Sequence, residues 1–160
     1  MKMCLSEGMK RIKELNERKD TLILNEQRRM RTSYKEGEQP VPVDYDYKKT
    51  REEIAKIDAE VRAIRCGISL ANCTVKLDDG LTIGEALVYL AQLNGENARL
   101  ESLAVHEKLT RRITTNGVLE YTVCNYEPDE VISDREELRA KIYALQLAID
   151  RANLNTYIEI

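Results

Sequence analysis

The chain has 160 residues and a formal net charge of −3. This length suits one domain with a buried core. The slightly acidic net charge does not favour nucleic-acid binding, which usually needs a basic surface. It is 42% hydrophobic and 33% charged, with no Trp or Phe, seven Gly and three Pro, a composition typical of long amphipathic helices rather than an all-β fold. We find no apolar run of roughly 18 residues and no secretory leader, and therefore expect a cytoplasmic protein that does not enter a membrane.

A first long helix is predicted over about residues 3–35. Its apolar stripe is loosely kept at helical spacing, and it consists of Leu5, Met9, Ile12, Leu15, Leu22 and Ile23. Past Asn25 the pattern is polar on every side and includes several arginines, which we interpret as a solvated face, with contact to a phosphate or an acidic surface as the alternative. Residues 36–43 are predicted to be a linker, because Gly37 favours a helix end and two prolines follow it.

The second helix is predicted over about residues 44–72. Its apolar positions alternate at spacings of three and four, as in a coiled coil, and they are Tyr47, Ile54, Ile57, Val61, Ile64, Ile68 and Ala71. Asp44 and Asp46 stand at its start, where they are weak candidates for a divalent cation site. Acidic residues are also favoured at a helix start by the macrodipole, and this second interpretation is the stronger one.

The link to the third helix carries clear folding signals. Asp78, Asp79 and Gly80 predict a tight turn, and the two aspartates form a second weak metal candidate. Thr82 and Glu85 then match a capping box, which opens a helix over about residues 82–110. This helix is apolar on most of its circumference, so we expect it to be buried by several neighbours or to serve a subunit interface.

A β-hairpin is predicted over about residues 111–124. Asn116-Gly117 is a strong hairpin-turn signal, and β-favouring residues flank it on both sides. Because a two-stranded hairpin is marginal by itself, we expect it to pack on the helices or on another subunit.

The fourth helix is predicted over about residues 134–157, opened by a capping box at Ser133 and Glu136. It carries a regular seam of apolar residues. The wide apolar faces of the third and fourth helices predict a homo-oligomer, and the candidate interface residues are Leu87, Leu90, Leu138, Ile142 and Ile149.

Catalytic motifs are not found. The single histidine, His106, has no partner in a Glu-x-x-His pattern, the four cysteines form no C-x-x-C pair, and no Gly-rich phosphate loop occurs. We therefore predict no catalytic residues and no cofactor, and we favour a non-enzymatic protein.

Several short motifs resemble those of a known family. They are residues 36–40 after the first helix, 68–72 at the end of the second, 77–82 with 85–86 at the start of the third, and 145–153 near the C-terminus. On these motifs the chain resembles the septicolysin-like family of small bacterial helical proteins of unknown function. The resemblance implies a long-helix bundle and little about activity. A lytic activity, which the family label suggests, is the least favoured interpretation, because no helix combines a strong apolar face with a basic polar face.

Together these features predict a mainly α protein. We expect a single domain over residues 1–160, built as an antiparallel, coiled-coil-like bundle of four long helices with one hairpin between the third and fourth. The leading functional hypothesis is a non-catalytic homo-oligomeric scaffold or protein-interaction module. The alternative is a ligand- or metal-binding protein, possibly an enzyme, whose site lies at a subunit interface.

Overall fold

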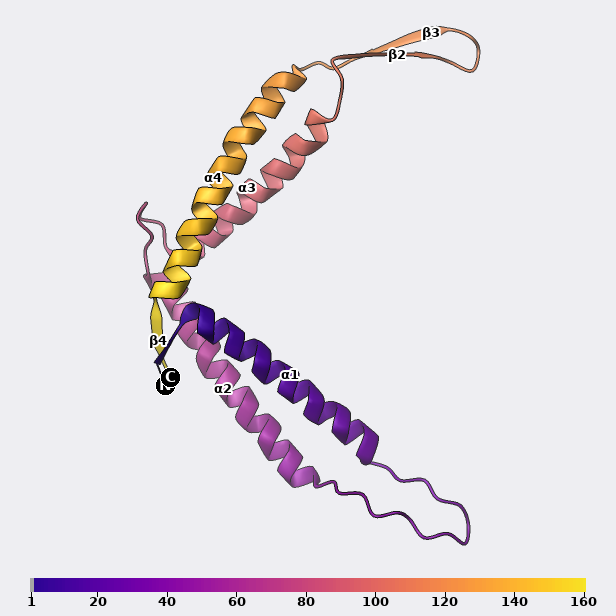
Figure 1. Ribbon diagram of the computed structural model, residues 1–160, viewed down its shortest axis with the longest axis vertical. Coiled ribbons are helices and arrows are strands. Elements are labelled where there is room, and N and C mark those ends of the chain that lie inside the picture. The colour runs from indigo at the N-terminus through magenta and orange to yellow at the C-terminus, as the bar shows by residue number, and fades with distance from the viewer. Residues whose placement is uncertain (1) are drawn as a thin grey trace. The chain divides into compact units, whose positions relative to one another are not determined.

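The computed structural model of the protein describes residues 2–160 and is mainly helical, as predicted (Figure 1). The helices are α1 (Leu5–Arg29), α2 (Tyr47–Thr74), α3 (Ile83–Ala104) and α4 (Pro128–Asn155). The strands are β1 (Lys2–Cys4), β2 (Leu109–Ile113), β3 (Leu119–Val123) and β4 (Tyr157–Glu159). The predicted hairpin, formed by β2 and β3, lies between α3 and α4.

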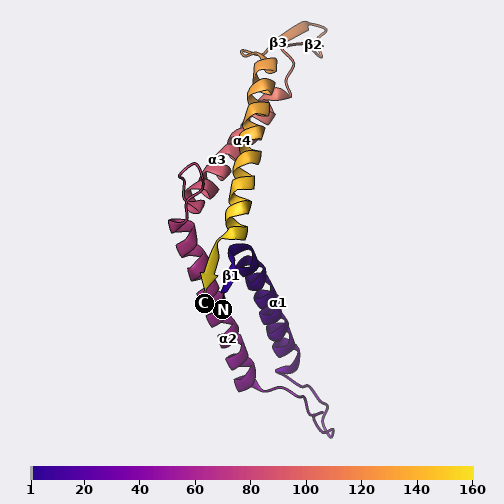
Figure 2. The same cartoon turned by 60° about the vertical axis from the view of Figure 1, so that its left-hand side comes forward.

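The chain folds into two compact units. The first contains the residues up to Thr74 together with Asn153–Ile160, and the second is Val75–Ala152. In the first unit α1 lies beside α2, and in the second α3 lies beside α4, in both views of the molecule (Figures 1 and 2). The predicted bundle of four helices is therefore not confirmed, and the structure supports two helical pairs.

The α1–α2 pair is held by an aliphatic seam and by ion pairs along its edge. In α2 the buried residues Ile57, Ile64 and Ala71 are seven apart, which is the spacing the sequence predicts for one face of this helix. At the edge, Arg11 of α1 lies 2.8 Å from Glu60 of α2, and two further charged side chains pair likewise. The buried side chains supply most of the stability, since exposed ion pairs contribute little.

A two-stranded ribbon, β1–β4, closes the first unit and was not predicted. Met3 pairs with Ile158 in antiparallel register, and both side chains are buried. Ile158 packs against two helical glycines: a Cβ added to Gly67 would lie 3.3 Å from its Cδ1 atom, and one added to Gly8 would lie 3.6 Å away. Glycine at position 67 lets the ribbon approach α2 closely, whereas at Gly8 the tightest contact of an added Cβ would be with Ile64 of α2, at 3.3 Å.

The α3–α4 pair begins with the predicted turn and capping box, and the structure confirms both. Gly80 has a φ of +89° in the turn. The Glu85 amide donates to Thr82 Oγ1 at 3.2 Å, and the Thr82 amide donates to Glu85 Oε2 at 2.8 Å. The bond from the Thr82 amide, and after it a bond of 2.8 Å from the Thr82 hydroxyl to the same carboxylate oxygen, lower the pKa of Glu85. Across the pair, Arg135 of α4 donates to Glu101 of α3 at 2.7 Å.

Several predicted helix ends are wrong. The first helix ends at Arg29 rather than near residue 35, so Gly37 lies in the connection and does not end the helix. The third ends at Ala104 rather than near 110, because the chain continues into β2. The fourth starts at Pro128, before the capping box predicted at Ser133. Proline suits a first helical position because it has no amide to leave unpaired.

Candidate functional site

The first aspartate pair lies where the connection enters α2. Asp46 Oδ1 accepts from the Lys49 amide at 3.1 Å, which is the hydrogen bond of a helix N-cap. The backbone carbonyl of Asp44 accepts from Arg29 at 3.1 Å. Between the aspartates, Tyr45 donates its hydroxyl to Glu26, and this hydrogen bond, followed by burial, raises the pKa of Tyr45 to about 12. Asp46 therefore caps α2, and the Asp44 carbonyl anchors Arg29 at the end of α1.

The second aspartate pair lies in the turn before α3. Asp79 Oδ1 accepts from the Leu81 amide at 3.0 Å, which fixes the turn. Asp78 and Asp79 line a shallow cavity of about 320 Å³ between α3 and α4, together with Tyr89 and Lys141. Within residues 2–160 no group of three His, Cys, Asp or Glu side chains gathers as metal ligands do, so a metal site at either pair gains no support from this geometry.

The predicted interface residues have two different environments. Leu90, Leu138 and Ile149 are buried in the chain itself, Ile149 at 1% exposure, so they are core residues. Leu87 is 43% exposed and Ile142 is half-buried. Of the five, these two keep surface that another molecule could cover.

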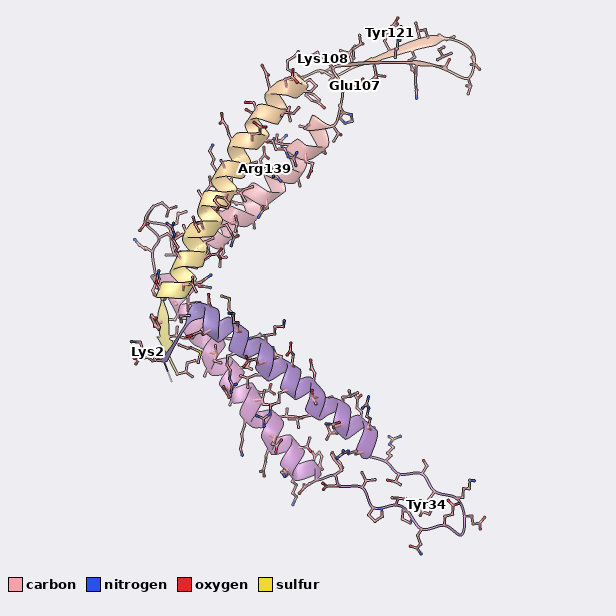
Figure 3. All side chains as sticks on the ribbon, viewed as in Figure 1. Lys2, Tyr34, Glu107, Lys108, Tyr121 and Arg139 are labelled. Atoms are coloured by element: carbon pink, nitrogen blue, oxygen red, sulfur yellow. The ribbon has the colours of Figure 1, made fainter. Side chains whose placement is uncertain are left out.

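The hairpin β2–β3 carries a group of exposed apolar side chains. All ten residues of its strands are exposed, and in Figure 3 Tyr121 lies out on the hairpin while Lys108 lies at its base. Of the two expected ways to cover the hairpin, packing on the helices is not found, and packing on another subunit stays a prediction.

One face of the hairpin is almost entirely apolar, and we call it the apolar hairpin face. Side chains alternate between the two faces of a strand, and the register places three cross-strand pairs on this face: Leu109 with Val123, Arg111 with Tyr121, and Ile113 with Leu119. The five uncharged side chains of this set are between 47% and 73% exposed.

The other face of the hairpin is polar. It carries Thr110 opposite Thr122 and Arg112 opposite Glu120, with the Arg112 Nε atom 2.6 Å from Glu120 Oε2. The hairpin is thus amphipathic, with one face suited to water and one face suited to a partner.

Hydrogen bonds at both ends hold the hairpin in shape. At its tip the Thr114 amide donates to the Val118 carbonyl at 2.8 Å, and Gly117 has a φ of +74°. At its base the Cys124 amide donates to the Lys108 carbonyl at 2.9 Å. The hydroxyl of half-buried Tyr126 donates to the Leu103 carbonyl at 2.8 Å, which ties the base to the end of α3.

Sequence reasoning predicted the hairpin but placed the interface candidates on the helices. The available signal was the alternation in residues 119–123, where apolar Leu119, Tyr121 and Val123 share one face. The pairing register, which decides what lies opposite them, was not predicted.

Comparisons with known proteins show the fold and no activity. No protein-family model matches the chain, and no curated protein matches it. Among solved structures, the crystal structure of a functionally unknown conserved protein from Corynebacterium diphtheriae is similar, with a TM-score of 0.70, 17% identity, and coverage of 99% of this chain and 100% of that one. The likeness to septicolysin-like proteins stays a prediction. None of the described helices has the length and apolar character needed to cross a membrane.

Proposed function

We propose that the protein is a cytoplasmic, non-catalytic, homo-oligomeric scaffold or protein-interaction module. The observation that carries this proposal is the apolar hairpin face, whose five large uncharged side chains are all exposed. A monomeric protein rarely exposes a contiguous apolar patch of more than a few hundred Å², and larger patches mark interaction sites.

The energetics of small sheets support the same proposal. A two-stranded hairpin is at best marginally stable when nothing packs on it, and among the residues that the structure describes no further strand pairs with either edge of this hairpin. Covering the apolar hairpin face would remove apolar surface from water and stabilise the hairpin and the complex together.

The test is the mass of the purified full-length chain by light scattering, over a dilution series of roughly 1–100 µM that brackets weak complexes. We expect a discrete oligomer whose population falls on dilution. A constant monomer mass over the whole series would overturn the proposal. Native mass spectrometry of the same sample would report any partner or small molecule that purifies with the chain.

A second candidate function is the binding of a small molecule in the α3–α4 cavity. This cavity of about 320 Å³ combines apolar residues with Asp78, Asp79 and Lys141, and its size is at the lower end for ligand sites. A retained metabolite whose binding is lost in Lys141→Ala and kept in Lys76→Ala, a change outside the cavity lining, would support it. Equal binding by the two variants would exclude it.

A further inference from the structure

We propose that the apolar hairpin face is a homodimer interface, in which β2 of one copy stacks over β3 of a second copy of this chain. This inference rests on the proposed oligomeric function and deepens it, because it names both the surface and its occupant. The occupant follows from the order of residues on the face.

The face is close to symmetric about its middle. An aliphatic pair lies at each end, Leu109 with Val123 and Ile113 with Leu119, and the one charged residue, Arg111, lies in the central pair beside Tyr121. A surface with this order matches its own copy, because each aliphatic end meets an aliphatic end whichever way the two faces are stacked. Self-complementarity is the requirement for a two-fold interface.

Electrostatics selects one of the two ways to stack. A two-fold axis across the strands would place Arg111 over Arg111 of the second copy, which brings two like charges together. An axis parallel to the strands places Arg111 over Tyr121 of the second copy, and Tyr121 over Arg111. A guanidinium over a tyrosine ring is attractive, and two-fold symmetry makes this contact twice.

The charge of the hairpin also favours a copy of itself over a strongly charged partner. The hairpin over residues 109–123 has a formal charge of only +1, and the segment from Glu107 through Glu127, both included, has three acidic and three basic residues and a formal charge of zero. A partner with a basic groove or an anionic surface would therefore gain little electrostatic attraction from this segment. Three cross-strand pairs on each copy are far fewer than the roughly 20–30 residues that each partner contributes to a standard stable interface, so we expect a weak dimer that dissociates on dilution.

The decisive experiment is a charge exchange between two copies. In Arg111→Glu a carboxylate would face the Tyr121 ring, and in Tyr121→Lys an ammonium would face Arg111. We expect each variant alone to dimerise about tenfold more weakly than the original chain, as for the loss of two cation–π contacts.

Mixing the two variants should restore the association. In an equimolar mixture, the carboxylate introduced at position 111 of one variant faces the ammonium introduced at position 121 of the other. At the second, symmetry-related contact, the unchanged Tyr121 of the first variant faces the unchanged Arg111 of the second. Both contacts are attractive, so we expect the mixture to form a heterodimer.

The control variants place the same new carboxylate and ammonium groups on the polar face. Thr110→Glu and Thr122→Lys lie one position away on the same two strands, and their side chains point to the opposite face. They should dimerise like the original chain. Sedimentation velocity gives the masses, and differential labelling of one variant identifies the heterodimer.

The possible outcomes distinguish the hairpin interface from the proposed oligomeric function on which it rests. A monomeric original chain would overturn both. An original chain that forms an oligomer, with Arg111→Glu and Tyr121→Lys forming it equally well, would overturn the hairpin interface and leave the oligomeric function standing. Two weakened variants that fail to recover on mixing would also overturn this interface, because damage to the fold of each hairpin is not repaired by a second chain.

Discussion

Within residues 2–160 the structure has two antiparallel two-stranded ribbons, and their environments are opposite. In β1–β4 the paired side chains of Met3 and Ile158 are both buried. In β2–β3 every strand residue is exposed, although its apolar face carries more large side chains. The β1–β4 ribbon, which has fewer large apolar side chains, is covered by its own unit, whereas the β2–β3 ribbon, which has more of them, is exposed.

This difference shows that strand composition does not decide whether a ribbon is covered; the surroundings decide it. The β1–β4 ribbon pairs segments near the two ends of the described residues, and Gly67 leaves room for Ile158 against α2. The β2–β3 hairpin extends from the ends of α3 and α4 (Figure 1). Since a bare two-stranded sheet is marginal, this second ribbon is the place to look for a partner.

The largest expected effect comes from truncating the side chain at the covered ribbon. Ile158 is 6% exposed, so Ile158→Ala should lower the free energy of unfolding by about 2–5 kcal/mol, through lost transfer energy and the cavity left behind. Ile113→Ala is the matched change in the exposed ribbon, at 73% exposure, and should cost under about 0.5 kcal/mol in dilute monomer. Urea unfolding followed by circular dichroism measures both. Equal losses would contradict the comparison.

The sequence predicts the helices far better than it predicts this contrast. The seam of α2 and the Thr82–Glu85 cap are local patterns, with the partners three to seven residues apart, and both are found in the structure. The β1–β4 ribbon pairs residues that are far apart in the chain, in strands of three residues. Such short strands leave no periodic signal, and only long-range packing creates them.

The same limit explains the candidate interface. An apolar stripe on a helix predicts that the stripe is buried, but it does not say whether the same chain or another one covers it. Leu90 and Ile149 are buried in the chain itself. The exposed apolar face depends on the register of β2 against β3, which turn geometry fixes.

A second, smaller effect is expected at the hairpin tip. Gly117 has a φ of +74°, where a residue with a side chain is strained, so Gly117→Ala should destabilise the hairpin by about 1 kcal/mol. That is about a fivefold rise in the ratio of open to closed hairpin, and association should weaken by up to about the same factor, because only the closed hairpin binds. Hydrogen exchange of the β2–β3 amides and sedimentation measure the two quantities.

Gly37→Ala is the control for this change. Gly37 has a φ of +87° and, like Gly117, nothing within 4 Å of an added Cβ, so the local strain is similar. It lies outside both ribbons, and association should be unchanged. If the two variants associate equally weakly, general destabilisation is the cause and the hairpin has no special role.

A third effect, smaller again, concerns the hairpin base at alkaline pH. Burial first, and then the neighbouring Cys124 thiol, raise the pKa of Tyr126 above its ordinary value. A raised pKa means that the neutral phenol favours the folded state. Its contribution is therefore complete below the ordinary tyrosine pKa of about 10 and is lost as the pH rises through the higher folded value. The difference in ultraviolet absorbance between the original chain and Tyr126→Phe should show one tyrosine titrating late. If Tyr126 titrated at the ordinary tyrosine pKa, the partly buried, hydrogen-bonded position of its hydroxyl at the base of the hairpin would be contradicted.

The smallest effect is expected on the polar face of the exposed ribbon. Arg112 and Glu120 pair across the strands at 2.6 Å, but their side chains are 76% and 47% exposed. Solvent screens such a pair, so Arg112→Ala should cost only about 0.2–1 kcal/mol of hairpin stability, and less in high salt. Because this face points away from the proposed interface, the same change should leave the dimer affinity within about twofold. Sedimentation at low and high salt tests both parts. A large loss of association would place the partner on the polar face, and the contrast between the two faces of the hairpin would then be wrong.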